Sequence, residues 1–190
     1  EILRKIKKPA AVKTLLRAAE ALREFPKIFS RVFLIIGFPN ETYSQILDTI
    51  NVSQIMNLDW YQVQVLQPLP NTVIYQQMKE EGLLEDTEYE NVRYSGGTYG
   101  KTAKVTESGR DMLDRDFKKV FDNKSLSEVA KKQDLEDIWS YMNFHLNYFK
   151  IPREINQIKQ QQYLNYLDHI TNVIAPNDAM AHYYAGLIEK

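Results

Sequence analysis

The turn GFPNET, residues 37–42, carries the residue types best suited to binding a ligand. Gly37 lets a ligand or a neighbouring backbone come close, because glycine has no Cβ. Pro39 fixes φ, and Asn40 tolerates the left-handed conformation better than most residues. Glu41 would suit the dipole in the first turn of a following helix. Because the turn follows an apolar run, we expect the N–H groups of residues 37–42 to face a ligand beyond the end of a strand.

A second loop, SGGTYGKT at 95–102, is close to a phosphate-binding sequence. That motif needs Gly-x-x-x-x-Gly-Lys-Ser/Thr after a buried strand, with a helix starting at the lysine. Here Ser95 stands at the first glycine position, and the next helix is expected near Thr106 instead of at Lys101. The loop would therefore lack a helix N-terminus aimed at phosphates. The sequence favours a flexible surface hairpin.

Composition removes several function classes. The 190 residues carry a formal charge of −1, which gives no basic stripe for nucleic acid. No apolar run approaches the roughly 18 residues needed to span a bilayer, so we expect a cytoplasmic protein without a membrane partner. Cysteine is absent, which excludes disulfides, thiolate nucleophiles and iron–sulfur ligation by this chain alone.

The remaining polar residues suggest neither a metal site nor a catalytic pair. The three histidines, His145, His169 and His182, do not show the paired spacing of a zinc motif. Asp134, Glu136 and Asp137 are typical of an acid-rich helix start. No nucleophile–base pair is evident, so the catalytic residues stay unknown.

The hydrophobic pattern predicts helices and strands in alternation over the first half of the chain. This order is typical of βαβ units with a parallel sheet. The run 31–37 is apolar on both faces, which predicts a strand covered on both sides. The expected elements are a helix at 9–24, a strand at 31–37, a helix from 41 to about 56, a strand at about 60–66, and a helix from about 72 to Gly82.

The second half reads as helical throughout. We place a boundary near residue 105, with an α/β part at 1–105 and an all-helical part at 106–190. The last two helices resemble part of a tetratricopeptide array, but a terminal helical hairpin explains them better, because one repeat cannot bury its own face. The expected helices lie at about 107–122, at 126–133 behind the capping box Ser125–Glu128, over Leu135–Leu146, over Ile155–Val173, and over Met180–Ile188.

Two motifs together resemble a known family. The segments FLIIGFPNET and QPLPNTVIY, followed by Gly82-Leu-Leu, look like the second half of a radical S-adenosylmethionine barrel. That family often writes G-F/L-P-G-E-T and P-x-P-G-T-x-x-Y. Asn40 and Asn71 replace the two glycines, and Asn and Gly are the residues that best accept left-handed turns. The opening EILRKIKKP also resembles the family, so the resemblance covers about residues 1–84.

The resemblance implies an α/β fold, the C-terminal part of a partial (βα)6 TIM-type barrel, followed by an all-helical extension. The earlier strands, and the Cys-x-x-x-Cys-x-x-Cys loop that holds a 4Fe–4S cluster, would lie upstream in a longer protein. There the cluster would reductively cleave S-adenosylmethionine to a 5′-deoxyadenosyl radical, and many similar proteins also have a cobalamin-binding domain. The fragment alone would be inactive.

The resemblance also implies site residues. The first turn would lie near the adenosine and ribose, and the residues after the next strand would contact the adenine. Our own inference adds two glutamines as lining of the substrate lumen, since polar residues inside a barrel are costly to bury without a role. These expected site residues are Gly37, Phe38, Pro39 and Glu41 for the first turn, Leu66, Gln67 and Leu69 after the strand, and Gln62 and Gln64 in the lumen.

Two functions stay open. The first is a radical enzyme fragment that uses a small-molecule cofactor and an unknown substrate. The second is a non-catalytic module whose helical half binds a partner protein. A cut barrel should expose strand edges and apolar surface, so the fragment is also expected to self-associate.

Overall fold

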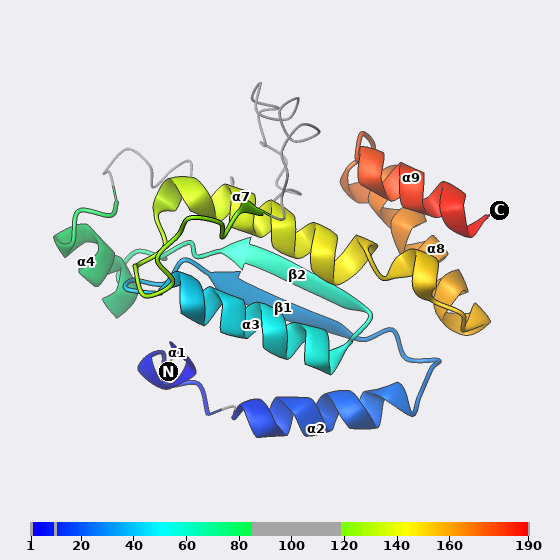
Figure 1. The fold of residues 1–190 in the computed structure, drawn as a ribbon, viewed down its shortest axis with the longest axis horizontal. Helices are drawn as coiled ribbons and strands as arrows, with labels where there is room; N and C mark the ends of the chain where they lie inside the picture. The colour runs from blue at the N-terminus through cyan, green and yellow to red at the C-terminus, as the bar shows by residue number, and fades with distance from the viewer. Residues whose placement is uncertain (1, 10, 85–118, 190) are drawn as a thin grey trace.

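The computed structural model describes residues 2–9, 11–84 and 119–189 of the chain. This part of the protein is mostly helical, with a small sheet at its centre (Figure 1). Its elements are α1 (Ile2–Lys5), α2 (Val12–Arg23), β1 (Arg31–Ile36), α3 (Tyr43–Met56), β2 (Trp60–Val65), α4 (Val73–Glu80), α7 (Lys132–Asn143), the π-helix η2 (Phe144–Tyr148), the 3₁₀-helix η3 (Ile151–Arg153), α8 (Gln157–His169), the π-helix η4 (Ile170–Ile174) and α9 (Ala179–Ile188).

The expected parallel βαβ unit is confirmed. Strands β1 and β2 pair in parallel, from Arg31 opposite Trp60 to Ile36 opposite Val65, and α3 connects them. The described residues contain only these two strands, so the partial barrel itself is not seen. The fold is a mixed α/β structure built on a two-stranded sheet.

One face of the sheet carries the main core. The inward residues of β1 and β2 pack against α3 and α7, which lie over the same face (Figure 1). Ile46 on α3 and Ile138 and Met142 on α7 are fully buried there. Helix α7 therefore belongs to the same hydrophobic core as the sheet, although it follows β2 by more than 60 residues in the sequence.

The opposite face of the sheet is largely uncovered, contrary to the expectation from the apolar run 31–37. The Phe33 and Ile35 side chains on β1 are 66% and 44% exposed. Helix α8 covers only the start of the strands, where Trp60 stacks edge-on against Tyr166 with ring centroids 4.8 Å apart. Parallel sheets normally have both faces covered by other elements. Among the described residues, most of this face has no such covering element.

The two edges of the sheet differ. On the outer edge of β2, the Asn147 side chain pairs with both backbone groups of Tyr61, and the Trp139 indole N–H donates to the Val63 carbonyl (2.8 Å). Within residues 2–9, 11–84 and 119–189, no strand pairs with the outer edge of β1. One edge is sealed by side chains, and the other is open.

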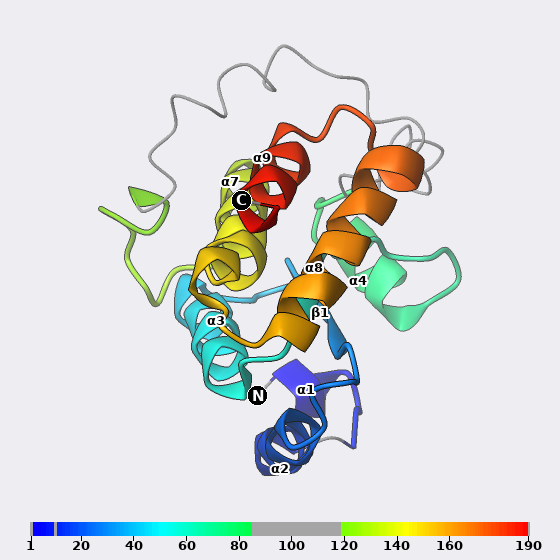
Figure 2. The same ribbon diagram turned by 90° about the vertical axis from the view of Figure 1, so that its right-hand side faces the viewer.

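A second core, in which four of the eight buried residues are aromatic, holds α8 and α9 against the amino ends of the strands (Figure 2). Both helices follow the expected positions and form the expected terminal hairpin, and each of them is capped by a side chain, Asn156 and Asp178 respectively. The buried members of this core are Trp60, Tyr148, Ile151, Tyr163, Leu167, Ile170, Ala181 and Tyr184.

One predicted helix is wrong. Residues 126–130 form turns and an extended segment, and α7 begins only at Lys132. The reason is tertiary: the Leu126 and Glu128 carbonyls accept from the first N–H groups of α3, and an antiparallel bridge joins Thr42 to Val129. The loop at 95–102, the boundary near 105 and residues 107–118 of the helix expected at 107–122 lie outside the described residues, and residues 119–122 form a short 3₁₀ and turn segment in place of the end of that helix.

Candidate functional site

The two strand ends share a turn geometry that the sequence predicted. Gly37 (φ +84°) and Asn40 (φ +61°) are left-handed after β1, and Asn71 (φ +63°) is left-handed after β2. Parallel pairing of Ile36 with Val65 places both turns at the same end of the sheet, where the strands finish. The left-handed conformation expected of Asn40 and Asn71 is confirmed.

Glu41 lies just before α3 and not in its first turn, where it was expected. It precedes the N-cap of α3 and is almost completely buried. Its carboxylate accepts hydrogen bonds from the N–H groups of Gly37 (2.6 Å) and Phe38 (3.2 Å). Burial raises its pKa, against the opposing effect of these two hydrogen bonds. The Glu41 carboxylate therefore binds the backbone of the turn on its buried side.

The N–H groups at the start of α3 are also paired within the chain. Thr42 and Gln45 form a reciprocal capping box (3.3 and 3.0 Å). The Tyr43 and Ser44 N–H groups donate to the carbonyls of Glu128 (3.1 Å) and Leu126 (2.9 Å). The Thr-x-x-Gln pattern could have predicted this capping box from sequence, whereas the pairing with the 126–130 segment has no local signal.

The first turn of α7 lies over the GFPNET turn. A Cβ added to Gly37 would come within 2.9 Å of the Leu135 Cδ1 atom. The Tyr43 hydroxyl donates to the Asp134 carboxylate, which also pairs with Lys124 (2.8 Å). These contacts hold the beginning of α7 above the strand ends, where a ligand was expected.

We expect Gly37→Ala to lower the free energy of unfolding by about 1–2 kcal/mol from backbone strain alone, and by more because of the contact with Leu135. Gly82→Ala is the matched control, because Gly82 is also left-handed (φ +67°) but has nothing within 4 Å of an added Cβ. Urea unfolding of both variants measures the difference. Equal losses would contradict close packing of α7 on the turn.

The other expected site residues lie either at the carboxyl ends of the strands or on the uncovered face of the sheet. The Leu66 N–H donates to the Ile36 carbonyl (2.8 Å) and extends the pairing by one residue. Leu69 is exposed, and its carbonyl accepts from Thr72, the N-cap of α4. Three more expected residues, Phe38, Pro39 and Gln67, are partly buried at the same end of the sheet.

Gln62 and Gln64 lie on the uncovered face, opposite Phe33 and Ile35 in the register. Both are partly buried. The Gln62 Oε1 atom accepts a hydrogen bond from the Arg31 guanidinium (3.0 Å). The face expected to line a lumen is thus the one that the described chain leaves largely uncovered.

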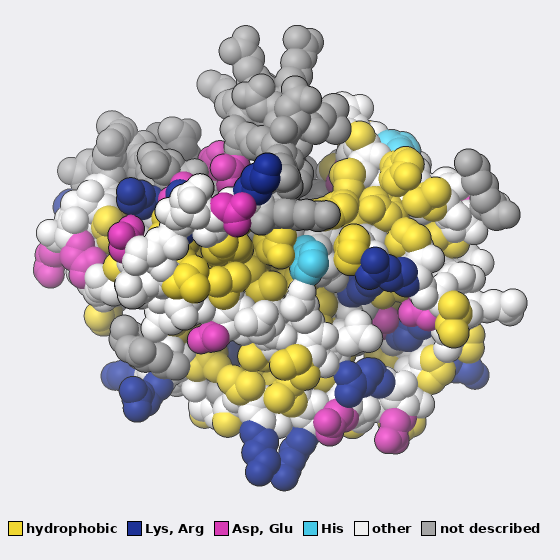
Figure 3. All heavy atoms as spheres, viewed as in Figure 1, with side chains coloured by type: hydrophobic (Ala, Val, Ile, Leu, Met, Phe, Trp, Pro, Cys, Tyr) yellow, Lys and Arg dark blue, Asp and Glu magenta, His cyan; other side chains and the backbone are white. Residues whose placement is uncertain are grey.

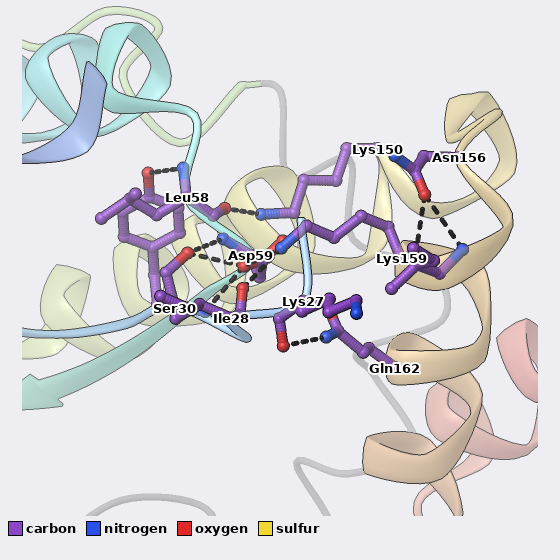
Figure 4. Close-up of polar contacts among 11 residues, drawn as sticks. Lys27, Ile28, Ser30, Leu58, Asp59, Lys150, Asn156, Lys159 and Gln162 are labelled. Atoms are coloured by element: carbon purple, nitrogen blue, oxygen red, sulfur yellow. Dashed lines mark hydrogen bonds and ion pairs between the residues drawn. The ribbon is translucent and has the colours of Figure 1, made fainter. Parts of the chain in front are cut away.

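A cavity of about 420 Å³ opens at the opposite end of the sheet, and no sequence pattern predicted it. It lies between the segments that lead into β1 and β2 and the start of α8 (Figure 4). Its lining residues are Leu22, Arg23, Pro26, Ser30, Asn57, Leu58, Asp59, Lys150, Arg153, Glu154, Asn156, Lys159 and Tyr163.

Asp59 organises the polar side of this cavity (Figure 4). Its Oδ2 atom accepts from the Ser30 backbone N–H (2.7 Å), the Ser30 hydroxyl (2.6 Å) and the Lys159 ammonium (2.8 Å). Lys159 also donates to the Ile28 carbonyl (2.7 Å). The Lys159 charge is therefore already compensated within the protein.

Lys150 also lines the cavity, and no carboxylate pairs with it directly in the described structure. Its ammonium donates to the Leu58 carbonyl and lies 5.1 Å from the centre of the Tyr61 ring. Loss of surrounding water lowers the pKa of Lys150 to about 7, and nearby Lys159 acts in the same direction, while Asp59 and Glu154 oppose the shift. A large fraction of this amine is neutral at physiological pH.

The lowered pKa of Lys150 predicts how the stability of the protein changes with pH. Between pH 7 and the ordinary lysine pKa, the folded chain binds fewer protons at Lys150 than the unfolded chain. The free energy of unfolding should therefore rise with pH in this window, by about 1 kcal/mol per pH unit. Lys150→Met should reduce that rise, measured by urea unfolding at pH 7, 8 and 9. The same rise in wild type and variant would show that Lys150 is an ordinary lysine.

Three further observations limit what the described residues can hold. They contain no group of three or more His, Cys, Asp and Glu side chains placed to bind a metal. Among the same residues, no helix has the length and apolar character needed to cross a bilayer. Acidic and basic side chains are interspersed on the face shown in Figure 3, in keeping with the formal charge of −1.

Comparisons with protein-family models, with curated proteins and with solved structures found no match to this chain.

Proposed function

We propose that this chain is the C-terminal part of a radical S-adenosylmethionine barrel, with β1 and β2 as the last two strands. In the complete protein, a 4Fe–4S cluster held upstream of Glu1 would reductively cleave S-adenosylmethionine. A cobalamin-binding domain upstream and a cytoplasmic location belong to the same proposal. The chain alone would be inactive.

The observation that carries the proposal is the asymmetry of the sheet. The outer edge of β2 is closed by Asn147 and Trp139, as the last strand of an incomplete barrel requires. The outer edge of β1 has no strand beside it among the described residues. An open edge of this kind is a template for another strand, and an earlier barrel strand would pair there in the same parallel direction.

The uncovered face supports the same arrangement. In a barrel, the face opposite the helices points into the lumen. Here that face carries Phe33, Ile35, Gln62 and Gln64, while α3 and α7 cover the other face. The two left-handed asparagines, each of which follows a proline in the turn after its strand, add support from the turns.

The residues of this chain fit the two cofactor groups differently. A 4Fe–4S cluster does not fit, because the chain has no cysteine to bind it. An open N–H cradle for S-adenosylmethionine is not present at the GFPNET turn either, because Glu41, the capping box and the 126–130 segment pair with the N–H groups of Gly37, Phe38 and residues 42–44. We infer that the GFPNET turn forms part of the boundary of the site. The residues that bind the cluster would lie upstream of Glu1.

The test uses the protein encoded by the complete reading frame that contains these residues. It is reconstituted anaerobically with iron and sulfide, reduced with dithionite and given S-adenosylmethionine, and 5′-deoxyadenosine is measured by mass spectrometry. The proposal predicts product from the complete protein and none from residues 1–190 alone. A well-folded complete protein that binds no cluster and forms no product would overturn it.

A second candidate is a protein-interaction module formed by α8 and α9. The observation that favours it is the separate aromatic core of this hairpin, which leaves Tyr183 on α9 61% exposed. If the complete protein shows no cluster chemistry, Tyr183→Ser should weaken the binding of a partner that co-purifies with the chain. Unchanged co-purification would contradict this second candidate.

A further inference from the structure

The cavity at the amino ends of the strands contains an amine in unusual surroundings. Lys150 donates to a backbone carbonyl, that of Leu58, and has no carboxylate directly paired with it among the described residues. Asp59, which lines the same cavity, is already paired with Lys159 and Ser30. Lysines that are desolvated or placed beside another cation are the ones that act as nucleophiles.

The rest of the cavity has an excess of positive charge. Arg23 and Arg153 also line it, and Glu154 is the only lining carboxylate that is not in the Asp59–Lys159 pair. The Arg153 guanidinium lies 4.1 Å from the centre of the Phe149 ring, while Arg23 donates to the Ile55 (3.2 Å) and Met56 (3.3 Å) carbonyls. Guanidinium groups have five donors, so both can also bind an anion.

We propose that Lys150 is the nucleophilic amine of a second site, which forms an imine with a small carbonyl compound whose anionic group is held by Arg153 and Arg23. This site lies at the opposite end of the sheet from the GFPNET turn and does not depend on the radical chemistry. A volume of about 420 Å³ is sufficient for a small phosphorylated or carboxylated aldehyde or ketone.

The chemistry balances without an oxidant or a reductant. The neutral amine attacks the carbonyl carbon and forms a carbinolamine. The carbonyl oxygen then leaves as water with the two hydrogens of the amine, and a carbon–nitrogen double bond remains. This step needs the amine unprotonated near neutral pH, as the lowered pKa of Lys150 provides. The imine formed in this way is neutral; if it takes up a proton from water, the resulting positive charge would be stabilised by Glu154, which lines the same cavity.

The probe is pyridoxal 5′-phosphate, an aldehyde with an anionic group, and pyridoxal is the neutral comparison. The folded wild-type chain is incubated with each at pH 6 to 10, the imine is reduced with cyanoborohydride, and the modified lysines are identified by peptide mass spectrometry. At pH 7 an amine with a pKa of about 7 has a neutral fraction about a thousand times that of an ordinary lysine. We expect Lys150 to be the main site, with a half-maximal rate near pH 7.

Three variants separate the parts of the proposal. Arg153→Gln and Arg23→Gln should each reduce the rate with pyridoxal 5′-phosphate about tenfold toward the rate with pyridoxal. Lys13→Met, which removes an exposed lysine on α2, should leave Lys150 labelling unchanged.

The pattern of modified lysines in the wild-type chain can by itself overturn the proposal. An unlabelled Lys150 in the folded chain, labelling spread evenly over the lysines, or a rate that rises only toward pH 10 would each show that Lys150 merely supports the Leu58 carbonyl. Equal rates with the two aldehydes would contradict the anion-holding role of the arginines.

Discussion

Asn147→Ala is expected to lower the free energy of unfolding by about 3 kcal/mol, one of the largest effects of any single change in this chain. Asn147 is completely buried in η2. Its side chain accepts from the Tyr61 N–H (2.8 Å) and donates to the Tyr61 carbonyl (2.9 Å). Alanine would leave both backbone groups buried without partners, and each unpaired group costs about 1–3 kcal/mol.

Asn143→Ala is the matched control for this prediction. Asn143 precedes η2 by one position, and its side chain donates only to the Trp139 carbonyl of its own helix (2.9 Å). Its loss should cost less than about 1 kcal/mol. Urea unfolding of the two variants gives the comparison. Similar small losses for both would mean that Asn147 does not seal the edge of β2.

Asp59→Asn is expected to cost about 3 kcal/mol of unfolding free energy, because it removes one partner of a largely buried ion pair. The Asp59 and Lys159 side chains are only 9% and 13% exposed. Asparagine retains the shape and one oxygen acceptor, so the loss mainly reports the uncompensated Lys159 charge.

Two further variants isolate that charge. Asp48→Asn on the exposed side of α3 removes the same charge at the surface and should change the free energy of unfolding by less than about 0.5 kcal/mol. Adding Lys159→Met to Asp59→Asn should recover part of the lost stability, since no unpaired charge remains buried. A double variant less stable than the sum of the two single losses would contradict this account of the cavity.

The sequence predicted the parallel βαβ unit because its signals are local. The run before Gly37, the alternation after Asp59 and the two left-handed asparagines are each readable within a few residues. The predicted helix at 126–133 failed because the backbone of that segment pairs with the start of α3, about 85 residues earlier in the chain. A local capping pattern carries no information about such a partner.

The polar residues of the second site could not be found in the same way. Lys150 and Asn147 act on Leu58 and Tyr61, which are about 90 residues away in the sequence. The π-helix that turns Asn147 toward β2 has no sequence signature that we recognise. Only the folded arrangement shows that these side chains complete the edge and one end of the sheet.

The lining of the proposed lumen also needs the structure. Gln62 and Gln64 were expected to line a lumen because polar side chains inside the expected barrel are costly to bury without a role, and the register now sets them opposite Phe33 and Ile35 on one largely uncovered face. The apolar run at 31–37 predicts a strand covered on both faces, so only the structure could show that this face is largely uncovered among the described residues.

The central claim, that this face becomes the interior of a larger barrel, can be tested directly by cysteine labelling. The chain has no cysteine, so Phe33→Cys introduces a single reporter on the uncovered face, and Asp48→Cys places a matched reporter on the outer side of α3. Each is labelled with maleimide in residues 1–190 and in the complete protein, and modification is quantified on the reporter peptide. We expect residue 33 to react readily in the short chain and at least tenfold more slowly in the complete protein, with residue 48 reactive in both. Equal reactivity at residue 33 in both proteins would contradict the barrel.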